Sequence, residues 1–568
     1  MPRAGSRLHG EGFVGEGRIV TTNGPPDLVL TRGRVYTMDA ARSWAEAVAV
    51  RAGRIIAVGS STEIEALHRP ETHVVDLHDR MLLPGFQDAH LHPTSGGLMQ
   101  IRCDLHGTST RQQSLERVAR YADAHPEHVW ILGGGWGMDA FPGGTPSKTD
   151  LDAIVPDRPV LLTNRDGHGA WVNSKALELA GISRETGDPR DGRIERDETG
   201  EPSGTLQEGA MGLVERLVPE TSSEEWQRAI KLAQAYLHTL GITAIQDAMV
   251  VPETLDAYRA LADRGELTAR VEGNLLWTRD KGDEQVADLV ELRSKGTAGR
   301  LRIRGAKIFQ DGVMENFTAA LLEPYLDGKG GSTQGKGLGM HEPEELAHMV
   351  TLLDVEGFQV HIHTIGDRAV RESLDAFEAA RLANGTRDSR HHLAHIQLIH
   401  PDDVPRFRKL GVVANAQPLW ATLSGYVEDL TLPFISEQTA RTMYPFGSLH
   451  RAGAAIAMGS DWTVSTANPL PQIQVAVNRA DPDEGDSEPF LPDERLELPT
   501  ALAAFTIGSA FVNGLERETG SIEAGKLADL ALLDRDLFAG DTKELGRARV
   551  LLTLVEGEPV FNHDESGW

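Results

Sequence analysis

The stretch "LLPGFQDAHLHP", residues Leu82 to Pro93, leaves an apolar run and ends with two histidines one residue apart. Alternate residues of a strand share a face, so His90 and His92 are expected to point in the same direction. Two neutral imidazoles that converge are typical ligands of a divalent metal. A chain with 21 histidines in 568 residues contains about one such pair by chance, so the pair alone is only a hypothesis.

Length and composition indicate a large globular protein with more than one domain. Of the 568 residues, 40% are hydrophobic and 25% are charged. The 56 Lys and Arg against 84 Asp and Glu give a net charge of −28, which makes nucleic acid and anionic membrane surfaces poor partners. We find no apolar run of the roughly 20 residues that a membrane span needs. The first residues also lack the apolar core of a secretory signal.

The single cysteine, Cys103, excludes an internal disulfide and a cysteine-based zinc site. It fits a reducing compartment, so we expect a cytoplasmic protein in which Cys103 is inert. Any metal must therefore be held by histidines, carboxylates or less usual ligands. The sequence carries no signal for the oligomeric state, and a homodimer is the working expectation.

Both ends of the chain are expected to build one small β-domain. Residues 27–84 hold short β-type runs such as "DLVLTRGRVYTM" and "AVAVRAGRIIAVG", and residues 515–568 hold "GKLADLALLD" and "RVLLTLVEGEPVF". Turn residues punctuate these runs, which is typical of antiparallel strands. Residues 1–26 are rich in glycine and polar residues and are expected to form a loose, disordered tail.

Residues 85–514 alternate short apolar strands with helical patterns. In "SSEEWQRAIKLAQAYLHTLG", Ser222 and Glu225 form a capping box and Gly241 can end the helix. The strand candidates are "MLLPGFQDAHLH", "TAIQDAMV", "RVEGNLLW", "RIRGAKIFQDG", "FQVHIHTIGD", "RHHLAHIQLI", "GVVANAQPLW" and "AAIAMGSDW". This order predicts an α/β fold, a (β/α)8 TIM-like barrel. The gap from about residue 94 to about 219 predicts an inserted subdomain after strand 1.

The catalytic groups of such a barrel lie at the carboxyl ends of its strands. Those ends carry His90 and His92 on strand 1, Lys307 on strand 4, His363 on strand 5, His395 on strand 6 and Asp461 on strand 8. This set is far more specific than one histidine pair. We expect His90, His92 and Asp461 to hold one metal ion. His363 and His395 could hold a second ion, with Lys307 between the two, so the sequence leaves one or two ions open.

Motifs along the chain resemble the amidohydrolase superfamily, and within it amidohydrolase family 3, which has a large insertion after strand 1 and is similar to the N-substituted formamide deformylases. They are "LLPGFQDAHLHP", "NRDGHGAWVNSKAL", "GTLQEGA", "KIFQDGVMENFTAALLEPY", "HTIGDRAV", "HHLAHIQLIHPDD", "GSDWTVSTANPL" and "TGSIEAGKLADLALLD". They span nearly the whole chain from Asp27 onward. The resemblance implies a metal-dependent hydrolase of carbon–nitrogen bonds, with a β-sandwich built from both termini.

The resemblance places Lys307 in the family's metal-bridging position. A bare ammonium would be repelled by two dications, whereas a lysine that has reacted with CO2 is an anionic carbamate whose two oxygens can bridge metals. A buried lysine with a lowered pKa supplies the neutral amine for this reaction. The alternative is an unmodified Lys307 paired with Asp311 or another carboxylate. Histidine and carboxylate ligands suit Zn, Fe, Mn or Co, with Zn the first expectation.

Asp461 is the expected catalytic residue, because it can accept the proton of the attacking water and pass it to the leaving nitrogen. The resemblance places His168 near the substrate, although a satisfied loop histidine is the alternative. The glycines of "GGGWGM" would let the backbone approach the pocket. Trp136 in this stretch would then form part of the pocket wall and contact the substrate, and the alternative is a tryptophan packed in a hydrophobic core. Phe141 and Trp171 are further candidate lining residues.

The expected substrate is a small, neutral or weakly polar N-acyl or N-formyl amide with an apolar amine portion. Arg165 leaves open an N-acyl amino acid, whose carboxylate would need a cation. A deaminase or a cyclic-amide hydrolase on the same barrel is the alternative enzyme, and a non-catalytic scaffold is a further alternative. The remaining histidines of the strand regions are expected to be structural or to lie behind the ligands, namely His361, His391, His392 and His400.

Overall fold

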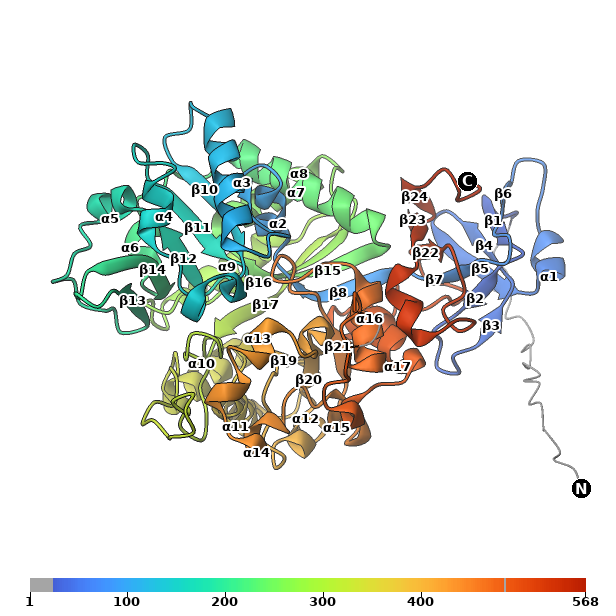
Figure 1. Ribbon diagram of the computed structural model, residues 1–568. Helices are drawn as coiled ribbons and strands as arrows, with labels where there is room; N and C mark the ends of the chain where they lie inside the picture. Colours follow the sequence, from blue (N-terminus) through green and yellow to red (C-terminus); the bar gives the residue numbers. More distant parts are fainter. Residues whose placement is uncertain (1–23, 485–486) are drawn as a thin grey trace, which may run out of the picture.

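The computed structural model describes residues 24–484 and 487–568 (Figure 1). The predicted tail, residues 1–26, lies outside the described residues except for Gly24, Pro25 and Pro26. At the centre is an eight-stranded sheet of order β21-β20-β19-β18-β17-β16-β15-β8. Its strands are β8 (Phe86–Leu91), β15 (Ile242–Val250), β16 (Arg270–Leu276), β17 (Leu301–Phe309), β18 (Gln359–Thr364), β19 (His392–His395), β20 (Val413–Ala416) and β21 (Ile456–Met458).

The eight strands form a nearly closed parallel barrel, as predicted from the sequence. Every pairing between neighbours in this sheet is parallel. The first and last strands meet where the Asp461 backbone N–H, just after β21, donates to the carbonyl oxygen of His90 at 2.7 Å. The Asn415 side-chain amide on β20 donates to the Ala89 carbonyl oxygen at 2.8 Å. These contacts bring the ends of strands 1, 7 and 8 together.

Helices alternate with the barrel strands along the chain (Figure 1). They are α7 (Ser223–Thr239), α8 (Pro252–Asp263), α9 (Gln285–Gly296), α10 (Pro343–Val355), α11 (Asp367–Asn384), α12 (Val404–Leu410) and α15 (Phe446–Arg451). In α7 the predicted capping box is present: the Glu225 N–H donates to the Ser222 hydroxyl at 3.2 Å, and the Glu225 carboxylate accepts from the Ser222 N–H at 3.1 Å. Gly241 follows this helix with φ +78°, a left-handed conformation that glycine adopts without strain.

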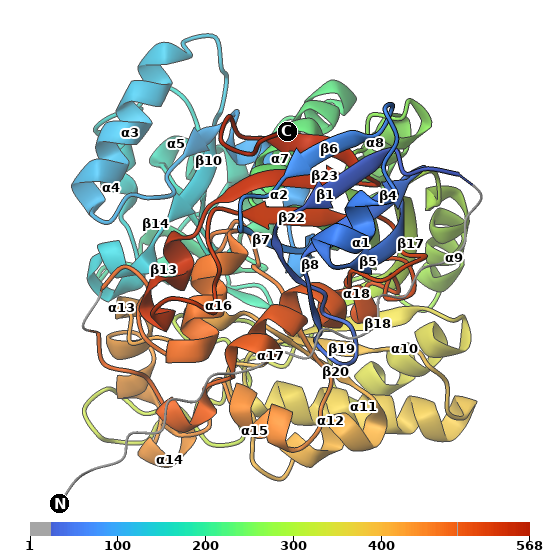
Figure 2. The same ribbon diagram turned by 90° about the vertical axis from the view of Figure 1, so that its right-hand side faces the viewer.

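Strands from both termini form two further sheets beside the barrel (Figures 1 and 2). One contains β5 (Arg54–Gly59), β4 (Ala47–Arg51), β1 (Leu28–Thr31) and β6 (His73–Asp76). The other contains β24 (Glu558–Asn562), β23 (Val550–Val555), β22 (Leu530–Leu533), β7 (Met81–Pro84), β2 (Arg34–Tyr36) and β3 (Trp44–Ala45). Leu30 and Val48 of the first sheet and Leu532 and Leu552 of the second belong to one buried cluster, as in a β-sandwich.

The opening sequence stretch is divided between two sheets. Strand β7 pairs with β22 in the terminal domain, and β8 pairs with β15 in the barrel. Gly85 lies between them, where an added Cβ would come within 2.4 Å of the Thr243 side chain. A continuous apolar run therefore carries the chain from one domain into the next, and only its second half is a barrel strand.

The insertion between β8 and α7 has its own six-stranded sheet, with order β13-β14-β12-β11-β10-β9. Its strands are β9 (Cys103–Asp104), β10 (Ile131–Trp136), β11 (Val160–Asn164), β12 (Gly169–Val172), β13 (Gly192–Arg196) and β14 (Pro202–Glu208). The sheet lies on the far side of the barrel from the terminal domain (Figure 1). None of the helices within residues 24–484 and 487–568 has the length and apolar character of a membrane span.

Candidate functional site

The six side chains predicted to form a metal centre lie together at the carboxyl end of the barrel. His90 ends β8, Lys307 and His363 lie on β17 and β18, and His395 ends β19. His92 precedes the short helix α2 (Pro93–Met99) at its N-cap position, and Asp461 follows β21. A cavity of about 580 Å³ opens over them, lined by His92, Lys307, His363, His395 and Asp461. Parallel strands end at one face of a barrel, which is why residues far apart in the sequence meet here.

Asp461 lies at the centre of the histidines. Its Oδ1 is 3.4 Å from Nε2 of His90 and 3.2 Å from Nε2 of His92, and its Oδ2 is 3.7 Å from Nδ1 of His395. One ligand atom each from His90, His395 and Asp461 lie within 4.8 Å of one another. This spacing brings nitrogen and oxygen donors to one point, as a divalent metal site requires.

The donor atoms at this point have no hydrogen-bond partners within the described residues. Nε2 of His90, Nδ1 of His395 and Oδ1 of Asp461 are all buried and unpartnered. Burial lowers the pKa of His90 to about 3, so its imidazole is neutral. Burial alone would raise the pKa of Asp461, but the surrounding His90, His92 and His395 imidazoles together stabilise its anion and hold the pKa well below its ordinary value. Neutral imidazoles beside an anionic carboxylate fit a divalent metal ion.

Lys307 is fully buried, and its Nζ has no hydrogen-bond partner in the described structure. The atom lies 4.8 Å from the centroid of the Phe309 ring. Burial lowers the pKa of Lys307 to about 7, which gives the amine a large neutral fraction at neutral pH. Asp311 does not pair with it: the Asp311 carboxylate accepts hydrogen bonds of 2.8–2.9 Å from the backbone N–H groups of Ala320, Ile365 and Gly366.

His363 and His395 lie side by side, with ring centroids 4.4 Å apart. Nε2 of His363 is 3.2 Å from the carbonyl oxygen of Gly312, which can only accept a hydrogen bond. The proton therefore lies on Nε2, and Nδ1 keeps a lone pair for a ligand. Burial lowers the pKa of both histidines well below the ordinary value.

His361, expected to be structural or to lie behind the ligands, contacts a predicted ligand directly. Its Nε2 is 2.7 Å from Nδ1 of His90, and its ring centroid lies 4.0 Å from that of His392. Asp88, which the sequence reasoning missed, accepts hydrogen bonds from the backbone N–H groups of His90 and Ser460 and so ties strand 1 to the chain after strand 8. The available signal was its place two residues before His90, on the same face of the strand.

His168 lines the cavity from the insertion, and its contact with a substrate stays a prediction. Its Nδ1 is 2.9 Å from Oε2 of Glu208, and its ring centroid is 5.1 Å from that of His363. Burial would lower the pKa of His168, but the Glu208 carboxylate, helped by Asp166 and Asp461, outweighs this effect and raises the pKa to about 9. Glu208, a cavity residue that was not singled out from the sequence, ends β14 and also accepts a 2.6 Å hydrogen bond from the Thr318 hydroxyl.

Trp136 lies in the core of the insertion, which corrects its prediction as a substrate contact. Its side chain is fully buried, and its indole N–H donates to the Leu162 carbonyl oxygen at 2.8 Å. It packs edge-on against Phe141 and Trp171, with ring centroids 5.5 and 6.3 Å away. The cavity is lined at this point by the backbone of Gly135. Alternation along β10 turns the large indole to the interior of the insertion.

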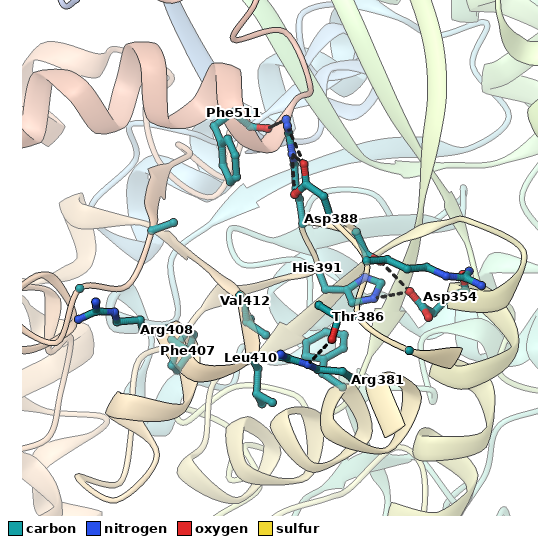
Figure 3. Close-up of a pocket in the computed structure, with 18 residues that line it drawn as sticks. Asp354, Arg381, Thr386, Asp388, His391, Phe407, Arg408, Leu410, Val412 and Phe511 are labelled. Carbon is teal, nitrogen blue, oxygen red and sulfur yellow. Dashed lines mark hydrogen bonds and ion pairs between the residues drawn. The ribbon is translucent and has the colours of Figure 1, made fainter. Parts of the chain in front are cut away.

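His391 lies at the other end of the barrel, in a separate pocket of about 260 Å³ (Figure 3). Its Nδ1 accepts the Val360 backbone N–H at 2.9 Å, so the proton is on Nε2, which is 3.1 Å from Oδ1 of Asp354. His391 therefore joins the amino end of β18 to helix α10, a structural role. His400 does not line the cavity over the candidate ligands, and its Nδ1 accepts the backbone N–H of Asp402 at 3.3 Å in the loop before α12.

The amidohydrolase family model matches residues 73–561, most of the chain. The chain belongs to the amidohydrolase family. Its members are hydrolases, and the assignment confirms the family identified from the sequence motifs. The amidohydrolase barrel, with its terminal β-strands, carries the cluster of His90, His395 and Asp461 at the expected strand ends.

Two relatives and one solved structure cover nearly the whole amidohydrolase chain. Protein LONG AFTER FAR-RED 3 of Arabidopsis thaliana is 34% identical over 94% of this chain and 91% of its own. The N-substituted formamide deformylase of Arthrobacter pascens is 29% identical over 95% of this chain and 99% of its own. The crystal structure of an uncharacterized metal-dependent hydrolase from Pyrococcus horikoshii OT3 aligns with a TM-score of 0.72 and 26% identity, over 91% of this chain and 99% of that one.

Proposed function

We propose that this amidohydrolase cleaves an amide carbon–nitrogen bond in a small molecule and depends on a divalent metal. An N-formyl or N-acyl amide is the first candidate substrate. The observation that carries the proposal is the convergence of unpartnered donor atoms on His90, His395 and Asp461 beside the buried Lys307. The name of the Arthrobacter pascens relative, N-substituted formamide deformylase, supports the type of bond.

The proposed ligands divide into two groups. His90, His92 and Asp461 would hold one ion, which the distances of 3.2–3.4 Å between the Asp461 carboxylate and the two imidazoles support. His363 and His395 would hold a second ion next to Lys307, and their ring contact of 4.4 Å supports this pairing. Zn is the first candidate metal. When bound, the metal supplies Lewis acidity and lowers the pKa of water.

Lys307 is the proposed site of a covalent modification by CO2. The neutral Nζ would form a bond to the carbon of CO2 and lose one proton to solvent, which leaves an anionic carbamate. The burial of Lys307 and its lowered pKa of about 7 support this step, because only the neutral amine is a nucleophile. A carbamate would turn an unpartnered buried amine into an anionic oxygen ligand.

Asp461 and His168 would handle the proton and the charge of the reaction. The Asp461 carboxylate accepts a proton from the attacking water and delivers it to the leaving nitrogen. Nδ1 of His168 donates a hydrogen bond to the Glu208 carboxylate at 2.9 Å, and the raised pKa of about 9 keeps the ring protonated at neutral pH. The N–H of its other ring nitrogen can therefore donate to the substrate carbonyl or to the oxyanion that develops from it. Both side chains line the cavity over Lys307.

Hydrolysis by the metal-loaded full chain tests the proposal. The substrates would be N-benzylformamide, an N-acetyl amino acid, a dipeptide and a cyclic ureide, with metal content measured in the same samples. We expect a formamide or acyl amide to be cleaved, chelation to abolish the activity, and Zn²⁺ to restore it. A preference for the ureide would indicate a cyclic-amide hydrolase. A chain that takes up no metal and cleaves none of these compounds would indicate a scaffold.

A further inference from the structure

A second cavity adjoins the one over the proposed metal ligands, and we refer to it as the side chamber. It has a volume of about 310 Å³. Residues that line both cavities are Arg165, Asp166, Val313, Ile365, Trp420 and Val464. The Trp420 ring also stacks on the His395 ring, with centroids 5.2 Å apart and planes 8° apart. A substrate whose amide lies at His395 can therefore extend its far end past Trp420 into the side chamber.

Aromatic and aliphatic side chains form much of the wall of the side chamber. Besides Trp420, it is lined by Leu419, Tyr426, Val427 and Tyr444. The guanidinium of Arg165 already lies over the Tyr426 ring, 5.7 Å from its centroid. Aromatic faces attract cations, so these walls suit a ligand with both an apolar body and a positive charge.

Carboxylates outnumber cations among the residues that line the side chamber. The acidic side chains are Asp139, Asp166, Glu315, Asp481 and Asp483, and the basic side chain in this described lining is Arg165. The Glu315 carboxylate accepts a long hydrogen bond, 3.5 Å, from the Thr431 hydroxyl. Burial and the neighbouring Asp166 carboxylate raise the pKa of Glu315 to about 7, so a cation bound beside it would favour the ionised form.

Two buried polar atoms in this lining lack partners within the described residues. Asp166 accepts the His168 backbone N–H on Oδ1 at 2.9 Å, whereas its Oδ2 is buried and unpartnered. Gln397 is only 3% exposed, and its Nε2 donor is also unpartnered. Buried polar groups are normally satisfied, so an unpartnered acceptor and an unpartnered donor on two residues of this lining suit a ligand that both donates and accepts hydrogen bonds.

We propose that the side chamber binds a cationic end of the substrate, an ammonium group carried on an aryl or alkyl chain, with Asp166 and Glu315 as its counter-ions. The inference rests on the proposed function, because it places the scissile amide at the metal-ligand residues. It differs from the expectation of an apolar amine portion. The difference arises because Glu315, Asp481 and Asp483 come from loops whose meeting is decided by the fold.

Calorimetry with the metal-loaded full chain tests the side chamber without turnover. Benzylammonium and benzyl alcohol share a ring and differ in charge. We expect benzylammonium to bind at least about tenfold more tightly, since a charge-assisted hydrogen bond is about twice as strong as a neutral one. Glu315→Gln and Asp166→Asn should each remove most of this preference. Equal binding of the two probes, or a preference that survives both substitutions, would overturn the inference.

Glu428→Gln is the matched control for these variants. Glu428 is exposed and lies on the short helix α13 (Gly425–Glu428) with Tyr426, but it does not line the side chamber. Glu428→Gln removes one negative charge, as Glu315→Gln does, but solvent screens the charge of Glu428 from the side chamber. We expect the preference for benzylammonium to be unchanged in Glu428→Gln. A loss there equal to that in Glu315→Gln would mean that overall charge, and not the chamber, attracts the probe.

Hydrolysis of three N-benzylformamides separates this inference from the proposed function. They carry an aminomethyl, a hydroxymethyl or a carboxyl group in the para position. We expect kcat/KM to be highest for the aminomethyl compound, by about tenfold, and this preference to vanish in Glu315→Gln. A preference for the carboxyl compound that Arg165→Ala removes would overturn the inference while the amide hydrolase stands. Binding of benzylammonium that needs Glu315, without cleavage of any of the three, would contradict only the proposed bond specificity.

Discussion

The Nε2 atom of His361 lies 2.7 Å from the Nδ1 atom of His90, so the two rings share one hydrogen bond. On its other side, Nε2 of His90 is buried, unpartnered and 3.4 Å from the Asp461 carboxylate. An imidazole that gives its Nε2 lone pair to a metal carries its proton on Nδ1, and an acceptor at that proton fixes the orientation of the ring. To accept this proton on Nε2, His361 must carry its own proton on Nδ1, which lies 3.3 Å from the Asn274 side-chain amide, whose oxygen is otherwise unpartnered within the described residues. His361 is thus placed to orient His90 from behind.

Replacement of His361 by leucine is expected to lower metal affinity by about 10- to 100-fold, the usual effect of losing a partner of a metal-bound histidine. His361→Gln keeps a side-chain oxygen that can accept the hydrogen bond and should retain more of the affinity. Competition with a chelator measures the affinity, and circular dichroism checks that the variants fold. Unchanged metal binding in His361→Leu would contradict the positioning role.

Asp461→Asn is expected to reduce kcat by about 100-fold or more, because an amide cannot carry the proton from water to the leaving nitrogen. The fold should persist, since the side chain keeps its size. Steady-state kinetics and thermal unfolding measure the two effects. Asp429→Asn, at an exposed position, is the control. More than about a tenth of the wild-type rate in Asp461→Asn would rule out proton transfer by this residue.

Lys307→Ala is expected to lose both activity and metal, because it removes the proposed bridging carbamate. Short carboxylic acids should partly restore both by supplying the missing oxygens. Metal analysis with and without added acetate or propionate is the measurement, and Lys295→Ala, at an exposed position, is the control. Full metal occupancy in a wild-type crystal with an unmodified amine at Lys307 would contradict the modification.

Glu208→Gln is expected to change how stability depends on pH. Glu208 is the largest of the interactions that raise the pKa of His168 from 6.5 to about 9, so the stability that it contributes is fully present below pH 6.5 and is lost as pH rises towards 9. In the variant, burial lowers the pKa of His168 against the attraction of Asp166 and Asp461 alone, and most of this contribution disappears. Urea unfolding of both proteins between pH 6 and 9.5 should show a wild-type advantage that shrinks with pH. An advantage that grows with pH would contradict this assignment.

Trp136→Ala is expected to destabilise the protein by about 3–5 kcal/mol, the range for removal of a large buried aromatic side chain. The fully buried indole packs against Phe141 and Trp171, so the variant would leave a cavity in the insertion. Chemical denaturation measures the loss, and Trp136→Phe should recover part of it. A variant with normal stability and a selectively raised KM would instead favour the substrate contact predicted from the sequence.

The clustering of the candidate ligands was predictable because barrel geometry makes the position of each one a local property of its strand. His90, Lys307, His363 and His395 each lie at or near the end of an apolar run, and parallel strands bring those ends to one face. The capping box of Ser222 and Glu225 could also be predicted from the sequence, because its contacts are local and lie within one helical turn.

Contacts between distant loops had no comparable signal. Glu208 meets His168 only because β14 and β12 pair antiparallel in the insertion. The pairing of His361 with His90 depends on how two barrel strands stagger, and alternation along β10 sends Trp136 to a core and not to the cavity. Periodicity identifies the face of a strand, but it does not say what lies opposite that face.

The sequence by itself determined the family, the order of the barrel strands and the set of candidate metal ligands, because these follow from local periodicity and from motifs at strand ends. The tertiary structure decided which charged side chains line the side chamber next to the candidate ligands. Asp166 lies in a loop of the insertion and Glu315 in a loop of the barrel, and both line the side chamber because the fold places these two loops next to each other. Long-range electrostatics is set by distances through space, which no pattern along the chain encodes.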